Sequence, residues 1–357
     1  MPVKSAITWT ETTWSPVIGC SKVSEGCRHC YAKREVDTRW SKNPKSVWFG
    51  RDFGDVLCRP DQLDAPLHWK KPRRIFVCPR ADLFHEDVGT IFIAQVFAFM
   101  GIASQHTFQV LTKRAERMRA LLNNPVFHAE MHRERLRIIC GSFVADAWEP
   151  DGRESRHLPL SNVWLGVSVE NQAAADERIP LLLQTPAAVR WISAEPLLGP
   201  MDLSPAYFPC HNAEGMRPDP ETGASECCRE CDYTGISNEM GLDWVVVGGE
   251  SGPHARPMHP QWARSLRDQC AAAGVAYLFK QWGEWKRAVD FRPDVMLPAN
   301  RWADVEQSGV VHLWPDARQL DGTITMGRGG KHLLQIYDAR LLDGVLHDGY
   351  PEVRHGR

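Results

Sequence analysis

The sequence predicts an α/β protein, specifically a complete or partial (β/α) barrel of parallel strands that carries a cysteine-containing insertion. Short apolar runs along the chain are continuous rather than alternating, which indicates strands buried on both faces. These runs alternate with helix-like segments, as expected for βαβ units. Almost every run ends in a charged or amide residue, and such strand ends form the active-site edge of a parallel sheet. A doubly wound open sheet is the alternative fold.

The expected elements follow one another along the chain. Residues 7–18 predict a strand or extended arm, residues 31–40 predict a helix, and residues 41–73 are irregular. Further strands are expected at 74–78, 107–111, 163–169, 189–193, 242–247 and 276–279. Helices are expected at 91–101, between 114 and 122, at 173–183 and at 261–273. We therefore expect a barrel domain over residues 1–290, an insertion at 204–240, and a C-terminal extension over 291–357 that packs on the barrel.

Composition limits the class of protein. A chain of 357 residues with 43% hydrophobic and 24% charged residues is typical of a globular protein with a large core. The net charge of −2 gives no overall basic surface for non-specific nucleic-acid binding. The N-terminus lacks an apolar signal region, and no run reaches the roughly 18 apolar residues of a membrane span. The sequence thus predicts a cytoplasmic protein without a membrane segment.

Cysteine and tryptophan are both abundant. Eleven cysteines without a signal peptide argue against a disulfide framework. Fourteen tryptophans, many near expected loop tips, either stack on a flat substrate or fill the rims of the barrel.

A loop near the N-terminus carries Cys20, Cys27 and Cys30 in a C-x6-C-x2-C pattern. Gly19 and Gly26 precede two of these cysteines and allow the backbone to fold tightly. Clustered thiolates need a cation to compensate their charge, so the pattern indicates a metal. Three cysteines leave one iron of a [4Fe-4S] cube open, whereas structural zinc takes four protein ligands. An open iron–sulfur cluster, zinc and free thiols remain the alternatives.

The insertion at 204–240 is a second candidate metal site. It contains a C-x2-C pair, and a long polar loop needs a cross-link such as a structural metal to adopt one conformation. Zinc, an auxiliary iron–sulfur cluster and free thiols are all open for it. The candidate ligands are Cys210, Cys227, Cys228 and Cys231, with His211 as a substitute for Cys227.

The first cysteine loop resembles the cluster loop of radical S-adenosylmethionine enzymes, in an expanded form of their usual C-x3-C-x2-C spacing. Several segments also resemble the phage-associated gene-product-thirty-seven/sixty-eight family, which has no assigned reaction. The resemblance covers roughly residues 7–290. It is carried by TWSPVIGCSKVSEGCRHCYA, VCPRADLFHEDV, VSVENQ, WISAEPLLGPMDL, WVVVGGESGP and FKQWGEW.

The resemblance implies a mechanism and a set of cofactors. Cys20, Cys27 and Cys30 would hold a [4Fe-4S] cluster whose open iron binds S-adenosylmethionine. One electron, from a donor such as a flavodoxin or ferredoxin, would then produce a 5′-deoxyadenosyl radical. His29 and Tyr31 are candidates for adenine contact, and the alternative for His29 is a solvent-facing loop residue.

The resemblance also suggests that Gly248, Gly249 and Glu250 contact the methionine amino group. In the resembled superfamily the corresponding segment follows an early strand, whereas here it follows a late one. A tight strand–helix turn explains the two glycines equally well.

Polar residues at the expected strand ends supply further candidates. Asp82, His85 and Glu86 could act as acid–base groups, the alternative being helix capping by Asp82. Barrel geometry directs the residues after three later strands to a common mouth. Of these we expect Glu195 and Lys280 to be catalytic, Glu170 and Asn171 to contact the cofactor, and Gln281 to lie beside them. Thr112, Lys113 and Arg114 offer anion contacts, or else helix capping and surface charge.

The sequence therefore favours a radical S-adenosylmethionine-type enzyme with an unknown substrate, for which a nucleobase or nucleic acid in a phage context is a candidate. The alternative is a non-enzymatic, zinc-stabilised protein that binds nucleic acid. The tryptophans, the basic segment at 69–74 and the insertion suggest that alternative, and the near-neutral charge opposes it.

Overall fold

The computed structural model describes residues 5, 7–150, 158–203, 207, 241–287, 302–306, 308, 311–313, 323–328, 340–343 and 345–351. The four candidate metal ligands of the insertion (Cys210, Cys227, Cys228 and Cys231) and its His211 lie outside the described residues.

The main sheet has seven strands, and their order in the sheet follows their order in the chain. Every neighbouring pair with a defined register is parallel. A doubly wound sheet reverses its strand order at a switch point, and this sheet does not. The α/β prediction is therefore confirmed, in its partial-barrel form with β1 and β9 as end strands. The strands are β1 (Thr12–Trp14), β4 (Arg74–Val77), β5 (Thr107–Thr112), β6 (Val163–Ser168), β7 (Val189–Ala194), β8 (Trp244–Gly248) and β9 (Ala276–Gln281).

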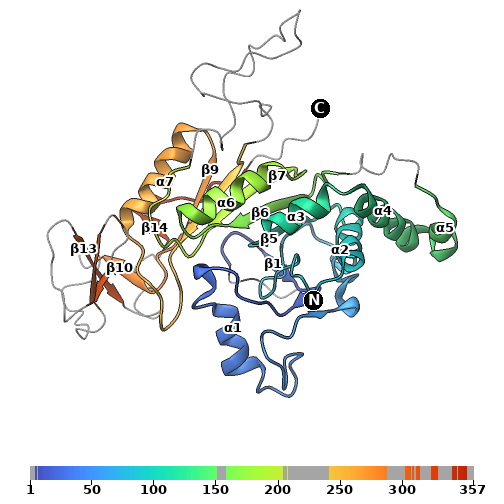
Figure 1. Cartoon of the computed structure of the whole chain (residues 1–357), viewed down its shortest axis with the longest axis horizontal. Helices are drawn as coiled ribbons and strands as arrows, with labels where there is room; N and C mark the ends of the chain where they lie inside the picture. The colour runs from blue at the N-terminus through green and yellow to red at the C-terminus, as the bar shows by residue number, and fades with distance from the viewer. Residues whose placement is uncertain are drawn as a thin grey trace, which may run out of the picture. The chain divides into compact units, whose positions relative to one another are not determined.

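Helices occupy the predicted positions between these strands (Figure 1). Two further helices, α4 and α5, follow α3 in a region for which the sequence analysis gave no element. The helices are α1 (Tyr31–Glu35) with its π-helical continuation η2 (Val36–Trp40), α2 (Thr90–Ile102), α3 (Ala115–Leu122), α4 (Pro125–Cys140), α5 (Ser142–Ala147), α6 (Gln172–Leu183) and α7 (Pro260–Ala272). Short 3-10 turns lie at η1 (Glu25–Cys27), η3 (Pro60–Gln62) and η4 (Ala65–His68).

The chain divides into two compact units. Unit 1 comprises residues 1–168, 185–189 and 353–357, and unit 2 comprises residues 169–184 and 190–352. Each unit has its own core. In unit 1, α2 is apolar on nearly all sides, and Phe97 packs edge-on against Phe127 of α4 with ring centroids 5.8 Å apart. In unit 2, the rings of Trp191 and Trp244 lie 5.2 Å apart on neighbouring strands.

Most of the tryptophans at expected loop tips fill cores. Stacking on a flat substrate would need an exposed ring face, and most of these rings have none. Those that are at most 5% exposed are Trp9, Trp14, Trp48, Trp282 and Trp285.

The exposed edge of β9 is covered by a segment from near the C-terminus. Phe279 donates its N–H to the His347 carbonyl (3.0 Å), and Gly349 donates to the Tyr277 carbonyl (2.9 Å). These bonds satisfy backbone groups that an edge strand leaves unpaired. The hairpin of β14 (Leu341–Leu342) and β15 (Val345–Leu346) leads into this segment.

Smaller sheets complete the described part of the chain. β2 (Val17–Ile18) pairs antiparallel with β3 (Leu57–Cys58). An antiparallel sheet with the order β10-β13-β11-β12 is built from β10 (Trp285–Arg287), β11 (Trp302–Glu306), β12 (Val311–Leu313) and β13 (Thr323–Arg328). Most of its strands lie in the predicted extension at 291–357, whose packing on the barrel as a whole stays a prediction. Among the described residues no helix is both long and apolar enough to cross a membrane.

A tight backbone contact in unit 2 makes a prediction about stability. A Cβ atom at Gly249 would lie 2.0 Å from the Trp282 carbonyl oxygen, and backbone there cannot yield cheaply. We expect Gly249→Ala to lower the free energy of unfolding by at least about 2 kcal/mol, as overpacking does. Gly54→Ala, where a Cβ meets nothing within 4 Å, is the matched control. Equal urea midpoints for the two variants would contradict the expectation.

Candidate functional site

The three predicted metal-site cysteines lie on one loop of unit 1, as free thiols of intermediate exposure. Cys20 follows β2, Cys27 ends η1, and Cys30 is the residue before the first turn of α1. Gly19 has a φ of +90°, and a Cβ there would lie 2.5 Å from the Asp55 carbonyl oxygen. The glycine before Cys20 is thus required by the backbone, as the sequence suggested.

A small hydrophobic core supports this loop from behind. It comprises Ile18, Ala32, Val36, Trp48 and Phe53, and Cys20 and Cys30 pack against it. The loop residues therefore rest on a packed surface rather than on solvent, which fixes the positions of two of the three thiols.

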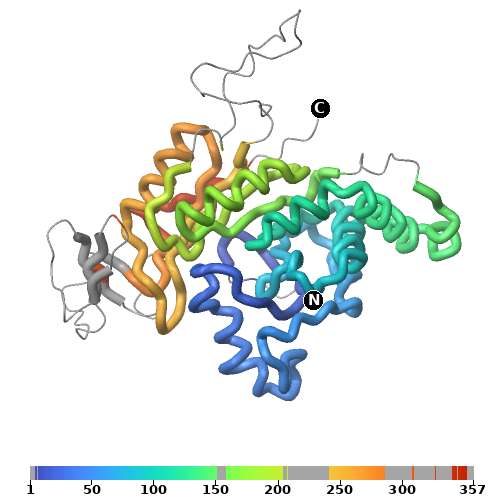
Figure 2. The backbone as a smooth tube through the Cα atoms, in the orientation of Figure 1, coloured from blue at the N-terminus to red at the C-terminus, as the bar shows by residue number. Residues whose placement is uncertain are grey.

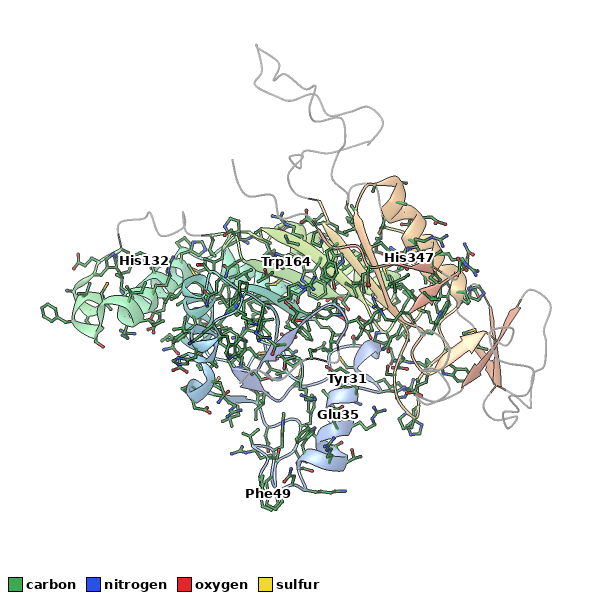
Figure 3. All side chains as sticks on the ribbon, turned by 180° about the vertical axis from the view of Figure 1, so that it is seen from behind. Tyr31, Glu35, Phe49, His132, Trp164 and His347 are labelled. Atoms are coloured by element: carbon green, nitrogen blue, oxygen red, sulfur yellow. The ribbon has the colours of Figure 1, made fainter. Side chains whose placement is uncertain are left out.

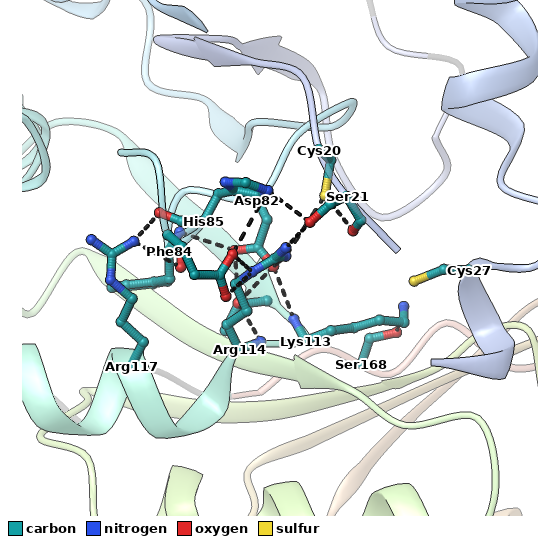
Figure 4. Close-up of polar contacts among 12 residues, drawn as sticks. Cys20, Ser21, Cys27, Asp82, Phe84, His85, Lys113, Arg114, Arg117 and Ser168 are labelled. Atoms are coloured by element: carbon teal, nitrogen blue, oxygen red, sulfur yellow. Dashed lines mark hydrogen bonds and ion pairs between the residues drawn. The ribbon is translucent and has the colours of Figure 1, made fainter. Parts of the chain in front are cut away.

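The guanidinium of Arg114, at the end of β5, is the centre of the polar network beside the loop (Figure 4). Its side chain is only 5% exposed. Nη1 donates to Asp82 Oδ2 (3.1 Å) and reaches Cys20 Sγ (3.7 Å), while Nη2 donates to Ser21 Oγ (2.8 Å). Nε lies 2.9 Å from both carboxylate oxygens of Glu86. Burial opposes the charge, but Glu86 and Asp82 outweigh it and raise the pKa of Arg114.

Asp82 orients this guanidinium. Its carboxylate accepts from Thr112 Oγ1 (2.7 Å) and from the backbone N–H groups of Lys113 (3.2 Å) and Phe84 (2.9 Å). The residue is 5% exposed, and α2 begins only at Thr90, so Asp82 closes a local turn and does not cap a helix. A carboxylate with this many donors is held rigidly, and it fixes Arg114 in turn.

His85 and Glu86 complete the group that the sequence placed after β4. His85 Nδ1 accepts from the Asp87 N–H (3.2 Å), which leaves the proton on Nε2 to bond Ser21 Oγ (2.8 Å). Burial, followed by the charge of Arg114, lowers the pKa of His85, so the ring is neutral at pH 7. Glu86 is mostly exposed. Its partial burial acts to raise the pKa of its carboxyl, but the hydrogen bond from Arg114 outweighs this effect and lowers that pKa.

Cys20 is a poor nucleophile in this environment. Burial and the charge of Asp82 raise the pKa of its thiol to about 11, and the Arg114 contact only partly offsets them. The thiol therefore keeps its proton at neutral pH unless a metal displaces it.

A further contact connects two strand ends near this thiol. Lys113 Nζ donates to Ser168 Oγ (2.7 Å), so the end of β5 is tied to the end of β6.

The two predicted cofactor contacts of the loop differ in their environment. Tyr31 is 40% exposed, and its hydroxyl donates to the Pro79 carbonyl, which ties α1 to the segment after β4. His29 is half-buried between Cys27 and Cys30. His29 thus lies within the loop, and Tyr31 is the first residue of α1 directly after it.

Unit 2 carries a second polar group at the ends of its strands. Lys280 Nζ lies 2.7 Å from both carboxylate oxygens of Glu195, and Gln281 Nε2 donates to Glu195 Oε1 (3.2 Å) and to Ser251 Oγ (2.9 Å). Gly248 leaves room for this carboxylate, because a Cβ there would lie 3.2 Å from the Glu195 Cδ. The structure thus brings together Glu195, Lys280 and Gln281, which the sequence listed only by their strand-end positions.

Three other predicted cofactor contacts have structural partners. Glu170 pairs with Arg178 at 3.0 Å, with both side chains almost fully buried. Asn171 caps α6 by accepting from the Ala174 N–H (3.0 Å). Glu250 is buried and accepts from the Arg256 guanidinium, with Nη2–Oε1 at 2.6 Å. Each of these contacts is sufficient to explain its residue, so their cofactor roles stay predictions.

Sequence reasoning missed two hydroxyls and underrated one cation. Ser21 belongs to the polar group around Arg114, and Ser251 belongs to the polar group around Glu195. Neither serine lies in a sequence motif that marks it as a site residue. Arg114 was expected only as an anion contact, whereas it contacts four residues from two other segments of the chain. Within the described residues, no group of three or more His, Cys, Asp or Glu side chains lies close enough together to hold a metal ion as it stands.

The fold and these sites define an α/β protein with an open parallel sheet and polar networks at the carboxyl ends of its strands. The chain belongs to the DUF5131 family, described as a protein of unknown function, whose model matches residues 4–351. No curated protein and no solved structure matches the chain.

The Asp82–Arg114 pair predicts a large stability effect. Asp82→Asn removes the buried counter-charge of the Arg114 guanidinium and leaves only the mostly exposed Glu86, so we expect a loss of about 3 kcal/mol in the free energy of unfolding. Asp61→Asn is the control, because Asp61 also pairs with an arginine but is 61% exposed, and its loss should be much smaller. Urea denaturation of metal-free protein measures both. Similar losses would show that burial of the pair does not matter.

The raised pKa of Cys20 predicts its alkylation behaviour in metal-free protein. Because only the thiolate reacts, the rate at Cys20 should rise about tenfold per pH unit from pH 7 to 9.5, without a plateau. Iodoacetamide labelling resolved by site with mass spectrometry measures this rate, with the exposed Cys140 as the internal reference. In urea the Cys20 profile should level off near its ordinary thiol pKa. A plateau below pH 9 in the folded protein would contradict the assigned environment.

Proposed function

We propose that this protein is a radical S-adenosylmethionine-type enzyme that holds a [4Fe-4S] cluster on Cys20, Cys27 and Cys30. The observation that carries the proposal is the cysteine loop itself. Its three thiols come from eleven consecutive residues, and its backbone is set by Gly19 and a small core. Three ligands from one loop suit a cube with one open iron better than a closed zinc site, which takes four.

The chemistry of the surroundings supports thiolate ligands. Three thiolates in one loop need positive charge nearby, and the buried Arg114 reaches Cys20 Sγ at 3.7 Å. The raised pKa of Cys20 argues against a free nucleophile, because that thiol gains its charge only when a metal replaces the proton. Hydrogen bonds to ligand sulfurs also tune the potential of a bound cluster.

When bound, the cluster and S-adenosylmethionine would supply a carbon radical by one-electron cleavage of a carbon–sulfur bond. The chain's own residues would hold and shield these groups. Asp82 fixes the Arg114 guanidinium, and Ser21 and His85 hold the loop beside Cys20 through the Ser21 hydroxyl. Tyr31 offers an exposed ring and His29 a half-buried one for adenine contact.

The remaining predicted roles belong to this proposal. In unit 2, the Lys280–Glu195 pair has a donor and an acceptor at 2.7 Å, which suits proton transfer or contact with a polar substrate. An electron donor such as a flavodoxin or ferredoxin would be required to reduce the cluster, and a cytoplasmic location would keep it from oxidation. For the insertion, zinc and an auxiliary cluster both stay open.

Anaerobic reconstitution tests the proposal. We expect the protein to bind about four more irons than its Cys20→Ala/Cys27→Ala/Cys30→Ala variant, because the insertion cysteines remain in both. Electron paramagnetic resonance of the reduced protein should change on addition of S-adenosylmethionine, since the cofactor binds the open iron. Cys140→Ala, at an exposed thiol outside the loop, should leave both results unchanged.

Two outcomes would overturn the proposal. The first is equal iron in the wild-type protein and the triple variant. The second is zinc without iron in protein purified without oxygen, which would support the zinc-stabilised binding protein instead.

A further inference from the structure

The segment that follows the cysteine loop forms a cap, defined here as residues 31–56. It comprises α1, η2 and the irregular turns after them, and Figure 2 shows the backbone running out through α1 and returning toward the strands of unit 1. Val36, Trp48 and Phe53 of the cap belong to the core that supports Cys20 and Cys30. The cap and the cysteine loop are therefore one packed structure.

Two neighbouring aromatic residues of the cap point in opposite directions. Trp48 is 5% exposed and stacks on Phe53 with ring centroids 5.9 Å apart, whereas Phe49 is 55% exposed. Figure 3 shows Phe49 at the outer end of the cap, away from Tyr31 and Glu35. The buried tryptophan thus anchors the turn that holds the phenylalanine in solvent.

The backbone of this outer turn is fixed by a series of hydrogen bonds. Gly50 donates to the Ser41 carbonyl (3.0 Å) and closes the loop, with a φ of +70° that favours glycine. Phe49 donates to the Ser46 carbonyl (3.0 Å), and Ser46 donates to the Asn43 carbonyl (2.9 Å). The backbone that carries the exposed ring is therefore ordered before any partner arrives, which lowers the entropy cost of binding.

The same turn has an excess of positive charge. Residues 38–51 contain four cationic side chains and no acidic one, in a protein whose net charge is −2. Lys42, Lys45 and Arg51 are exposed, and none of them forms an ion pair with another described residue. The fourth, Arg39, lies over the Trp40 ring at 4.9 Å. The outer turn of the cap thus carries four cationic side chains in the same segment as one exposed aromatic ring, and the nearest acidic residues in the sequence, Asp37 and Asp52, lie just outside that segment.

We propose that the outer end of the cap binds single-stranded nucleic acid, with Phe49 stacking on a base and Lys42, Lys45 and Arg51 contacting phosphates. Positive side chains that follow the backbone, together with an aromatic platform, are the usual means of binding single strands. A duplex offers no free base face to a single exposed ring, so the single strand is favoured.

A lipid surface is the competing partner for an exposed aromatic ring among cations. Membrane anchoring needs a continuous apolar face, and in this turn only Phe49 and Val47 (39% exposed) are exposed large apolar residues. Polar residues, Asn43, Lys45 and Ser46, separate them from any wider apolar surface. The small apolar area and the interspersed charges favour a nucleic-acid strand.

The inference that the cap binds a single strand depends only on these observations. As an indication of substrate it rests on the proposed function, because the core under Phe49 also supports Cys20 and Cys30. A strand held on the cap would then be the polymer that the enzyme modifies.

Fluorescence anisotropy with labelled oligothymidylate of about 12 nucleotides tests the inference on the full-length protein. We expect Phe49→Ala to weaken binding at least about fivefold, because stacking on one base is lost, and Phe49→Trp to restore it. The double variant Lys42→Gln/Lys45→Gln should make the slope of log affinity against log salt shallower by about 1.4, since two phosphate contacts disappear.

Matched controls come from the same chain. Phe143→Ala removes an exposed phenylalanine (88%) on α5, and Lys70→Gln/Lys71→Gln removes two exposed lysines from the other basic segment. Both should leave the affinity and the salt slope unchanged. Circular dichroism melting of Phe49→Ala should match that of the wild-type protein, because the exposed ring contributes little to the core.

Several outcomes would overturn the inference. Equal losses for the cap and control variants would indicate non-specific charge attraction. Cosedimentation with phosphatidylserine vesicles that depends on Phe49, without oligonucleotide binding, would assign the cap to membranes. The binding test needs no bound iron. If the wild-type protein fails to bind the oligonucleotide but gives the expected cluster signal, this inference is wrong and the proposed function still stands.

Discussion

The buried guanidinium of Arg114 is the constraint around which unit 1 is organised. A charge that is removed from water destabilises the folded state strongly unless opposite charges and hydrogen bonds compensate it. Asp82 and Glu86 provide the opposite charge, and Ser21 and the Cys20 sulfur accept further bonds or contacts. Because these partners come from the loop after β2 and the segment after β4, satisfying one side chain brings three distant segments together. The position of Cys20 thus depends on this charge compensation as well as on the small core behind the loop.

Charge compensation recurs in unit 2, but its pairs differ in accessibility. Glu170 and Arg178 are almost fully buried, and Glu250 lies buried against Arg256, so these pairs hold strand–helix connections. Glu195 and Lys280 keep 18% of each side chain exposed, which leaves them able to meet a ligand. Candidate catalytic pairs and structural pairs use the same residue types. Partial exposure at a strand end is therefore the feature that distinguishes the Glu195–Lys280 pair from the buried pairs.

Under the two proposals, the small core of the cap would serve both chemistry and recognition. Its buried face, with Val36, Trp48 and Phe53, supports two of the loop cysteines, and its outer turn displays Phe49. A rigid turn makes both tasks possible, because the hydrogen bond from Gly50 to Ser41 keeps the two faces in a fixed relation. In the proposed enzyme, the element that grips the strand is continuous with the element that holds the cluster.

The sequence by itself determined the strands of the parallel sheet, most of the helices between them and the cysteine loop with its required Gly19, because these follow from local apolar runs and spacing. The tertiary structure alone decided the contacts between distant residues, such as Arg114 with Cys20 (94 apart) and Gln281 with Glu195 (86 apart). It also decided that Asn171 caps a helix and that Trp48 is buried while Phe49 is exposed. An irregular loop has no periodicity to mark its inner face, and a strand-end side chain finds its partner only when the sheet places both at one edge.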